Sequence, residues 1–187
     1  MRKAFLLLLC LCSTISHAQT SLFQSVAARY KTIQSATAMV TKTINNGASS
    51  TGILNIRKPD LVSITTNGNQ EKLIMQGNTF TMTYEGRDMQ TDSRKNQQFT
   101  PNYSVLTSLI NGGTTDISSL EDVKVEKRSN NIVITVTPPS GWFWRRGLFK
   151  SFVLVLNSQT SEFRSLSINM RNGTDMTYTF TDFKFKN

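Results

Sequence analysis

The 187-residue sequence has very few of the side chains on which thiol and imidazole chemistry depends. It contains two cysteines and one histidine, and these three residues (Cys10, Cys12 and His17) all lie within the first 17 positions. If that segment is removed as a signal peptide, the mature chain has no thiol, disulfide or imidazole. This excludes Cys/His and Ser-His-Asp nucleophile systems, histidine acid–base catalysis and nearly every type of zinc site.

Carboxylates are the remaining route to catalysis, and they need to occur as a converging pair. The nearest candidate pair is Glu121 and Asp122, adjacent residues that we expect at the solvated start of a strand. The sequence therefore predicts no catalytic residue, no metal site and no cofactor.

Residues 1–18 have the pattern of a secretory signal peptide. A basic head, "MRK", precedes the apolar run "AFLLLLCLC", and the small-residue sequence "SHA" comes just before Gln19. The apolar run is shorter than the ~20 residues of a stable membrane anchor, although an uncleaved anchor is the alternative interpretation. Cleavage after Ala18 predicts a periplasmic protein with one domain, residues 19–187, large enough to bury roughly two thirds of its unfolded surface.

The chain is basic, with a formal net charge of +9 that falls to +7 when Arg2 and Lys3 are removed. A basic exported domain is expected to approach anionic membrane surfaces or acidic partners, and its export makes nucleic acid an unsuitable partner.

Hydrophobic periodicity predicts a helix followed by many strands. "SLFQSVAARYKTI" has one apolar stripe at helical spacing (Leu22, Phe23, Val26, Ala27, Tyr30 and Ile33). A second short helix is predicted in "TPNYSVLTSLINGG", between Pro101 and the Gly112–Gly113 stop. The other segments are short Thr-, Val-, Ile- and Phe-rich runs separated by turn sequences such as "QGN" and "YEGR".

These elements predict a mainly β fold with some α-helix. Short polar turns favour a consecutive antiparallel meander, and a sheet of so many strands in one domain has to curl. We expect a single curled antiparallel sheet, with two or three helices plugging its concave face and an apolar pocket left between them.

Five segments resemble the LolA-like family of periplasmic carriers of outer-membrane lipoproteins, and they follow the family's order over nearly the whole mature chain. These are "ARYKTIQSATAMVTKTI", "GILNIRKPDLVSI", "LIMQGNTFTMTY", "PNYSVLTSLI" and the closing run from Ser151 to Asn187. The resemblance implies an unclosed barrel with a helical lid over a cavity for acyl chains. It also implies a cycle of partners: acylated lipoproteins, an inner-membrane lipoprotein-releasing transporter and an outer-membrane acceptor.

The candidate cavity residues are the apolar residues of these strands and of the second helix: Leu54, Ile56, Val62, Ile64, Phe80, Met82, Tyr84, Leu106, Leu109 and Ile110. Each of them could equally be an ordinary core residue. Lys58 stands where the family has an arginine tied to lid closure, so the resemblance implies a lid latch that lacks the guanidinium fork. Family aromatics are replaced here by Asn55, Val62 and Ile64, which implies a smaller or more polar cavity wall.

The segment "SGWFWRRGLFKSF" is not a feature of the family pattern. It combines aromatic residues with cationic ones, as membrane-interface segments do, so we interpret Trp142, Phe143, Trp144, Arg145, Arg146 and Lys150 as a docking site for an anionic membrane or a partner. The alternative is that the aromatic residues fold back over the sheet edge.

The sequence therefore favours a non-enzymatic, monomeric lipoprotein carrier that shuttles acyl chains from the inner to the outer membrane. Two alternatives remain open. The same fold can bind another amphiphile, such as a glycolipid or a pigment precursor, or can sense mislocalised lipoproteins. A carboxylate-based hydrolase would require two acidic groups facing each other in the pocket.

Overall fold

Eleven antiparallel strands form one continuous sheet in the described part of the chain. The structure is a computed structural model, which describes residues 18–45, 47–92, 95–96, 98–115, 117, 120, 122–138 and 147–187. The strands are β1 (Ser35–Ile44), β2 (Ser49–Arg57), β3 (Leu61–Thr66), β4 (Glu71–Gln76), β5 (Thr79–Tyr84), β6 (Arg87–Asp92), β7 (Val123–Arg128), β8 (Asn131–Val136), β9 (Phe149–Asn157), β10 (Phe163–Met170) and β11 (Asp175–Lys186).

The strand order is β6-β5-β4-β3-β2-β1-β11-β10-β9-β8-β7. Consecutive strands pair as the short turns predict, and the additional pairing joins β1 to β11 at the centre of the sheet. Strands β6 and β7 are the two edges. Helix α2 (Thr100–Ile110) is inserted between them in the chain and so connects one edge of the sheet to the other.

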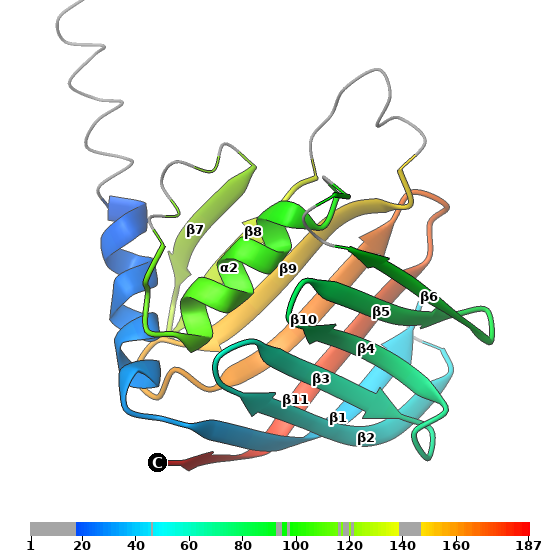
Figure 1. The fold of residues 1–187 in the computed structure, drawn as a ribbon, viewed down its shortest axis with the longest axis horizontal. Helices are drawn as coiled ribbons and strands as arrows, with labels where there is room; N and C mark the ends of the chain where they lie inside the picture. The colour runs from blue at the N-terminus through cyan, green and yellow to red at the C-terminus, as the bar shows by residue number, and fades with distance from the viewer. Residues whose placement is uncertain are drawn as a thin grey trace, which may run out of the picture.

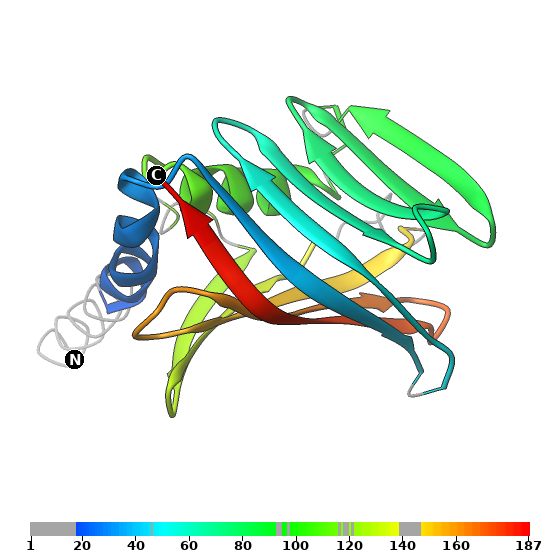
Figure 2. The ribbon, with the colours of Figure 1, turned by 90° about the horizontal axis from the view of Figure 1, so that it is seen from below.

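The sheet curls into an unclosed half-barrel (Figures 1 and 2). Strands β1–β6 form one wall, β7–β10 form the other, and α2 lies between the two walls on the concave side. The N-terminal helix stands at one end of the half-barrel, close to the C-terminus of the chain.

Alternating burial along the strands distinguishes the concave face from the convex one. In β1, Ala36, Ala38 and Val40 are buried, whereas Thr37 and Met39 between them are exposed. The buried set has the two-residue period of a strand with one face in a core, and the buried positions of the other strands join the same apolar cluster.

The predicted helices are both present, and two rather than three are seen in the described residues. Residues 18–27 are helical and continue into the 3-10 turn η1 (Ala28–Lys31), with Phe23, Val26 and Tyr30 buried on one side. No helix in the described ranges is long and apolar enough to cross a membrane.

Close packing of β2 on β3 depends on Gly52, the first residue of the Gly52–Pro59 run. A Cβ atom at this position would lie 1.8 Å from the main-chain oxygen of Thr65. Glycine at this position therefore permits the close approach of the two strands.

Candidate functional site

A small apolar cavity lies between the concave face of the sheet and α2. Its volume is about 20 Å³, which is room for about one water molecule. The side chains that line it are Val62, Ile64, Leu73, Met75, Phe80, Asn102, Leu106, Phe152, Leu154, Phe163, Leu166, Ile168 and Phe180. An acyl-sized pocket is therefore not open under α2 in this conformation, because side chains of the sheet and of α2 fill this part of the half-barrel.

Four of the ten predicted cavity residues line this cavity: Val62, Ile64, Phe80 and Leu106. The others are placed elsewhere: Leu54, Ile56, Met82, Leu109 and Ile110 are buried in the core, and Tyr84 is half-buried near one end of the half-barrel. Asn55, which we expected to make the wall more polar, lies exposed on the convex side because its strand position is out of phase with Leu54 and Ile56.

The sequence analysis missed the wall contributed by the C-terminal strands. Phe152 and Leu154 line the cavity from β9, and Phe163 and Leu166 line it from β10. The two-residue spacing of Phe152 and Leu154 was visible in the sequence, whereas Phe163 and Leu166 are three residues apart because the register shifts between Phe163 and Ser165. What the sequence did not provide was the β1–β11 pairing, which brings this wall opposite β3 and β4.

Asn102 is the one polar residue among the described residues that line the cavity. It lies in the first turn of α2, and its exposed fraction is 7%. Its side-chain amide adds hydrogen-bond donors and an acceptor to a wall that is otherwise apolar.

Polar contacts fix the lid, defined here as residues 18–31 together with α2, at one corner of the half-barrel. The Lys58 ammonium donates a hydrogen bond to the Lys31 carbonyl (2.9 Å), and the Asn111 amide donates one to the Pro59 carbonyl (2.7 Å). The two bonds connect both lid helices to the turn between β2 and β3. Lys58 therefore links the end of the N-terminal helix to the turn between β2 and β3, and its role as a latch stays a prediction.

The N-terminal helix has a second anchor in Tyr30. Its hydroxyl donates to the Ser161 carbonyl (3.0 Å), and its ring packs against Phe163 and Phe185. Burial and the nearby Glu162 carboxylate raise the pKa of Tyr30, so the hydroxyl keeps its proton and the bond persists at physiological pH.

The other end of α2 packs through aromatic rings. Phe99, the residue before the helix, lies 4.3 Å from Phe80 and 5.0 Å from Phe149 between ring centroids. An outer groove of about 440 Å³ adjoins this cluster and is lined by Phe80, Met82, Met89, Gln90, Thr91, Asn96, Gln98, Phe99, Leu148 and Phe149. Because Phe80 borders both spaces, the cluster separates the groove from the cavity.

The acidic pair required by a hydrolase does not occur in the cavity wall, where none of the described lining residues is a carboxylate. The described ranges also contain no group of three or more His, Cys, Asp or Glu side chains that could hold a metal ion. Of the pair named in the sequence analysis, Glu121 lies outside the described residues.

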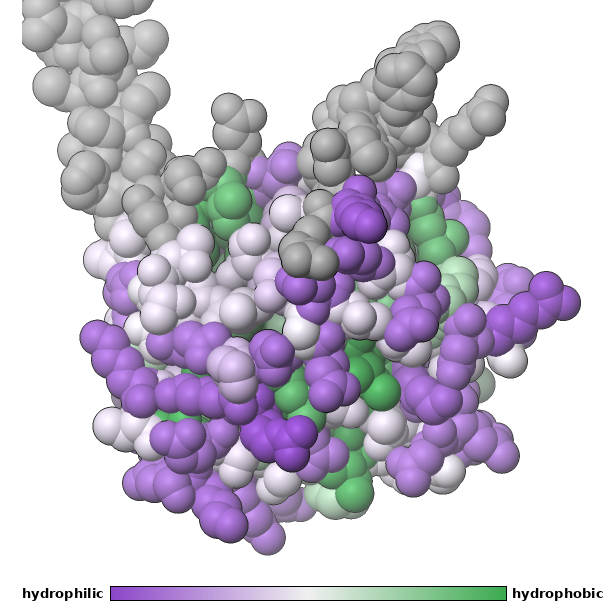
Figure 3. Space-filling view, viewed as in Figure 1, coloured by the Kyte–Doolittle hydropathy of each residue, from purple (hydrophilic) through white to green (hydrophobic). Residues whose placement is uncertain are grey.

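The predicted docking segment is only partly described. Trp142, Phe143, Trp144, Arg145 and Arg146 lie outside the described residues, and Lys150 is exposed on β9. On the face shown in Figure 3, hydrophobic surface occurs as small separate patches among hydrophilic and neutral residues.

These features define a class of architecture: a half-barrel with an apolar concave face and a helical lid. The structural neighbours of the chain include a LolA superfamily protein of Nitrosomonas europaea (9% identity, TM-score 0.38, covering 90% of this chain and 94% of that one). They also include a putative outer-membrane lipoprotein-sorting domain of Vibrio parahaemolyticus (10% identity, TM-score 0.46, covering 92% and 94%).

A chain of the MucA/MucB complex of Pseudomonas aeruginosa is another neighbour (15% identity, TM-score 0.46), with 91% of this chain matching 58% of that one. No family model matches the sequence. No curated protein matches it either. The Nitrosomonas and Vibrio neighbours carry names of the group that the resemblance named, but similarities at this level carry no argument about function.

Proposed function

We propose that this protein is a non-enzymatic carrier that binds acyl chains between the concave face of the half-barrel and its lid. The observation that carries the proposal is the apolar interior under α2, which retains a cavity lined by apolar side chains and by Asn102. Apolar walls recognise hydrocarbon without regard to its detailed shape, and Met75 in the observed wall suits chains of variable conformation.

Binding requires the lid to move, because the closed cavity holds about one water. The polar contacts described above hold the C-terminal end of α2, whereas its N-terminal end packs through Phe99. We infer that α2 swings about the Asn111 end and that an acyl chain enters from the outer groove when Phe99 moves away from Phe80.

The expected cargo is an acylated lipoprotein in the periplasm. Each methylene kept out of water contributes about 0.8 kcal/mol, so a lipid-anchored protein does not cross an aqueous compartment unaided. The partners in this proposal are an inner-membrane lipoprotein-releasing transporter, an outer-membrane acceptor and, transiently, an anionic membrane surface. The carrier acts as a monomer after its signal peptide has been removed.

A binding experiment tests the proposal directly. Delipidated residues 19–187 are titrated with a synthetic diacylated lipopeptide, and binding is followed by displacement of a fluorescent acyl probe and by native mass spectrometry. We expect a one-to-one complex. Absence of any complex, or of probe displacement, would overturn the carrier proposal, and a different co-purified mass from the native host would favour another amphiphile.

The Asn102→Leu variant tests whether the acyl chains bind in the cavity under α2. Leucine is larger than asparagine and occupies the small cavity, so we expect lipopeptide binding to weaken while the protein stays folded. Asn55→Leu is the matched control, since it makes the same change on the convex face. Equal binding by Asn102→Leu and wild type would show that the chains do not occupy this cavity.

A further inference from the structure

The concave face changes from apolar to polar along the direction of its strands. In β1 the buried series Ala36, Ala38 and Val40 continues onto Lys42, which is a charged residue with an exposed fraction of only 5%. In β4 the buried series Met75 and Leu73 continues onto Glu71. The polar positions lie at the opposite end of the strands from the N-terminal helix.

Lys42 and Glu71 form an ion pair across the concave face. The Lys42 ammonium lies 2.9 Å from Glu71 Oε2, and the side chains are 6% and 28% exposed. The Thr66 hydroxyl (2.9 Å) and the Ser50 hydroxyl (3.3 Å) donate to the same oxygen. Glu71 Oε1 receives no hydrogen bond from the described residues, and one Lys42 N–H is used in the pair.

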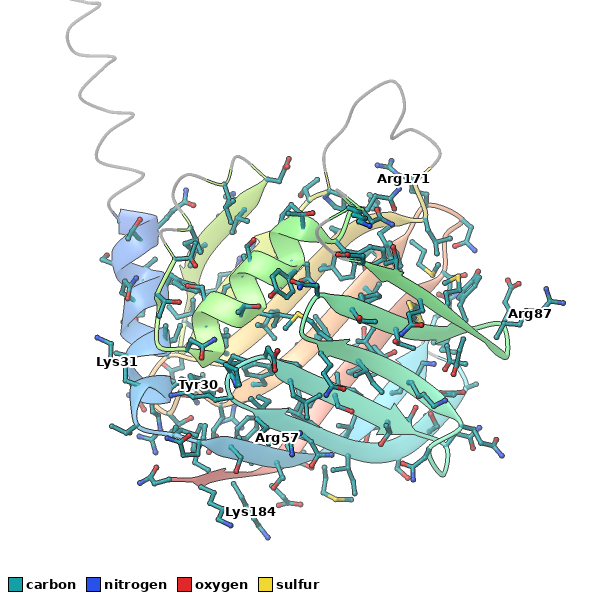
Figure 4. The ribbon with its side chains drawn as sticks, in the orientation of Figure 1. Tyr30, Lys31, Arg57, Arg87, Arg171 and Lys184 are labelled. Carbon is teal, nitrogen blue, oxygen red and sulfur yellow. The ribbon has the colours of Figure 1, made fainter. Side chains whose placement is uncertain are left out.

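An end pocket of about 590 Å³ opens over this pair, at the end of the half-barrel that Arg87 marks in Figure 4. Its lining residues are Lys42, Ile44, Asn67, Gln70, Glu71, Thr83, Tyr84, Glu85, Gly86, Thr174 and Met176. The pocket is far larger than the inner cavity and mixes hydrogen-bonding groups with the aliphatic side chains of Ile44 and Met176. Such a lining suits the polar end of an amphiphile.

We propose that this end pocket binds the head group of the amphiphile and that the head group is neutral, with both hydrogen-bond donors and acceptors, as in an acylglycerol. The inference rests on the proposed function, because it assumes that the hydrocarbon part of the amphiphile lies along the apolar part of the concave face, toward α2. A ligand hydroxyl donates to Glu71 Oε1, and a ligand carbonyl or hydroxyl accepts from the Lys42 ammonium.

The charges of the site favour a neutral head group over an anionic one. Lys42 and Glu71 compensate each other, so the buried pair offers no net positive charge to a carboxylate or phosphate. Burial raises the pKa of Glu71, but the hydrogen bonds from Lys42 and Thr66 outweigh burial and hold the pKa below its ordinary value. Glu71 is therefore an ionised acceptor at neutral pH, and a second anion beside it would be repelled.

Three ligands with the same ten-carbon tail distinguish the possible head groups: monodecanoylglycerol (neutral donor and acceptor), methyl decanoate (acceptor alone) and decanoate (anion). Affinities are measured by displacement of a fluorescent acyl probe, below the critical micelle concentration of each ligand. We expect the wild type to bind monodecanoylglycerol about tenfold more tightly than methyl decanoate, which corresponds to the loss of one or two hydrogen bonds. Decanoate is expected to bind more weakly than monodecanoylglycerol.

Two double variants test whether the ion pair between Lys42 and Glu71 causes this preference. Lys42→Met/Glu71→Met should abolish the tenfold preference, whereas Lys124→Met/Glu126→Met should leave it unchanged, because that ion pair lies on β7 and does not line the end pocket. If the buried double variant does not fold, the isosteric Glu71→Gln, which replaces the free carboxylate oxygen with an amide group, is expected to lower the preference several-fold.

The outcomes separate this inference from the proposed function. Equal affinity of the wild type for all three ligands, tighter binding of decanoate, or an unchanged preference in the variants would overturn the head-group site and leave the carrier proposal intact. Failure of every ligand to bind would overturn both.

Discussion

The ammonium of Lys58, at the turn between β2 and β3, donates a 2.9 Å hydrogen bond to the main-chain carbonyl of Lys31, at the end of η1. We expect Lys58→Met to release this contact and to accelerate both acyl-probe uptake and hydrogen exchange in residues 18–31. The free energy of unfolding should fall by less than about 1 kcal/mol, because the bond is solvent-accessible. Lys31→Met is the matched control, since it removes a charge and keeps the accepting carbonyl. Wild-type uptake and exchange in Lys58→Met would refute the latch.

Gly112 follows the end of α2 and packs against Lys31 of η1. Its backbone conformation is left-handed (φ +80°). A Cβ atom there would lie 2.4 Å from the Lys31 Cγ and 3.2 Å from the Lys31 Cα. We expect Gly112→Ala to lower the free energy of unfolding by about 2–4 kcal/mol, from the left-handed conformation and overpacking together. Gly173→Ala, at φ +87° with nothing near its Cβ, should cost about 1–2 kcal/mol. Denaturant unfolding of the two variants measures the difference, and equal losses would argue against tight packing of the two lid helices.

Glu71 has a lowered pKa, so its ion pair should contribute to stability at neutral pH and lose that contribution in acid. The sign follows because the unfolded chain takes up the proton at a higher pH, about 4.3, than the folded one. The difference in unfolding free energy between wild type and Glu71→Gln should be constant above about pH 5.5 and shift against the wild type as the pH falls through the folded pKa. A difference that is independent of pH down to pH 3 would contradict the ion pair.

The aromatic–basic segment remains a prediction from the sequence. We expect Trp142→Ser/Phe143→Ser/Trp144→Ser to fold normally and to bind anionic vesicles more weakly than the wild type, because interfacial aromatic residues and nearby cations act together at such surfaces. Met39→Ser/Ile53→Ser is the matched control, since it removes hydrophobic residues that are 49% and 47% exposed on the convex face. Unfolding of the triple variant would mean instead that the aromatic residues belong to the core.

Local features of the fold could be predicted from the sequence because they depend on local chemistry. The turn at Glu85–Gly86, where both residues have positive φ, follows from the glycine, and the end of α2 follows from Gly112 and Gly113. The stripe that includes Phe23, Val26 and Tyr30 predicted the buried side of the N-terminal helix for the same reason. The curled meander followed from the number of strands and the shortness of their connections, whereas the unclosed barrel was implied by the family resemblance.

The composition of the site could not be predicted in the same way. The pairing of Val40 with Phe180 joins residues 140 positions apart, and no local pattern specifies it. Without it, the wall formed by Phe152 and Phe163 could not be assigned to the cavity. Lys42 is a different case, because the alternation of β1 places it on the concave face and the ion pair with Glu71 then follows from the sheet register. The sequence thus indicated that Lys42 faces the concave side, but only the structure identified Glu71 as its partner.

Helix α2 lies in the chain between β6 and β7, the two edge strands of the sheet. The backbone therefore passes from one edge of the sheet to the other through this helix. In the proposed mechanism the N-terminal end of α2 moves and its Asn111 end stays fixed, so acyl-chain binding would act on the connection to β6. Edge strands offer main-chain groups to which another chain can add. An acceptor protein that adds to the edge strand β6 would thus distinguish the loaded carrier from the empty one without contacting the acyl chain.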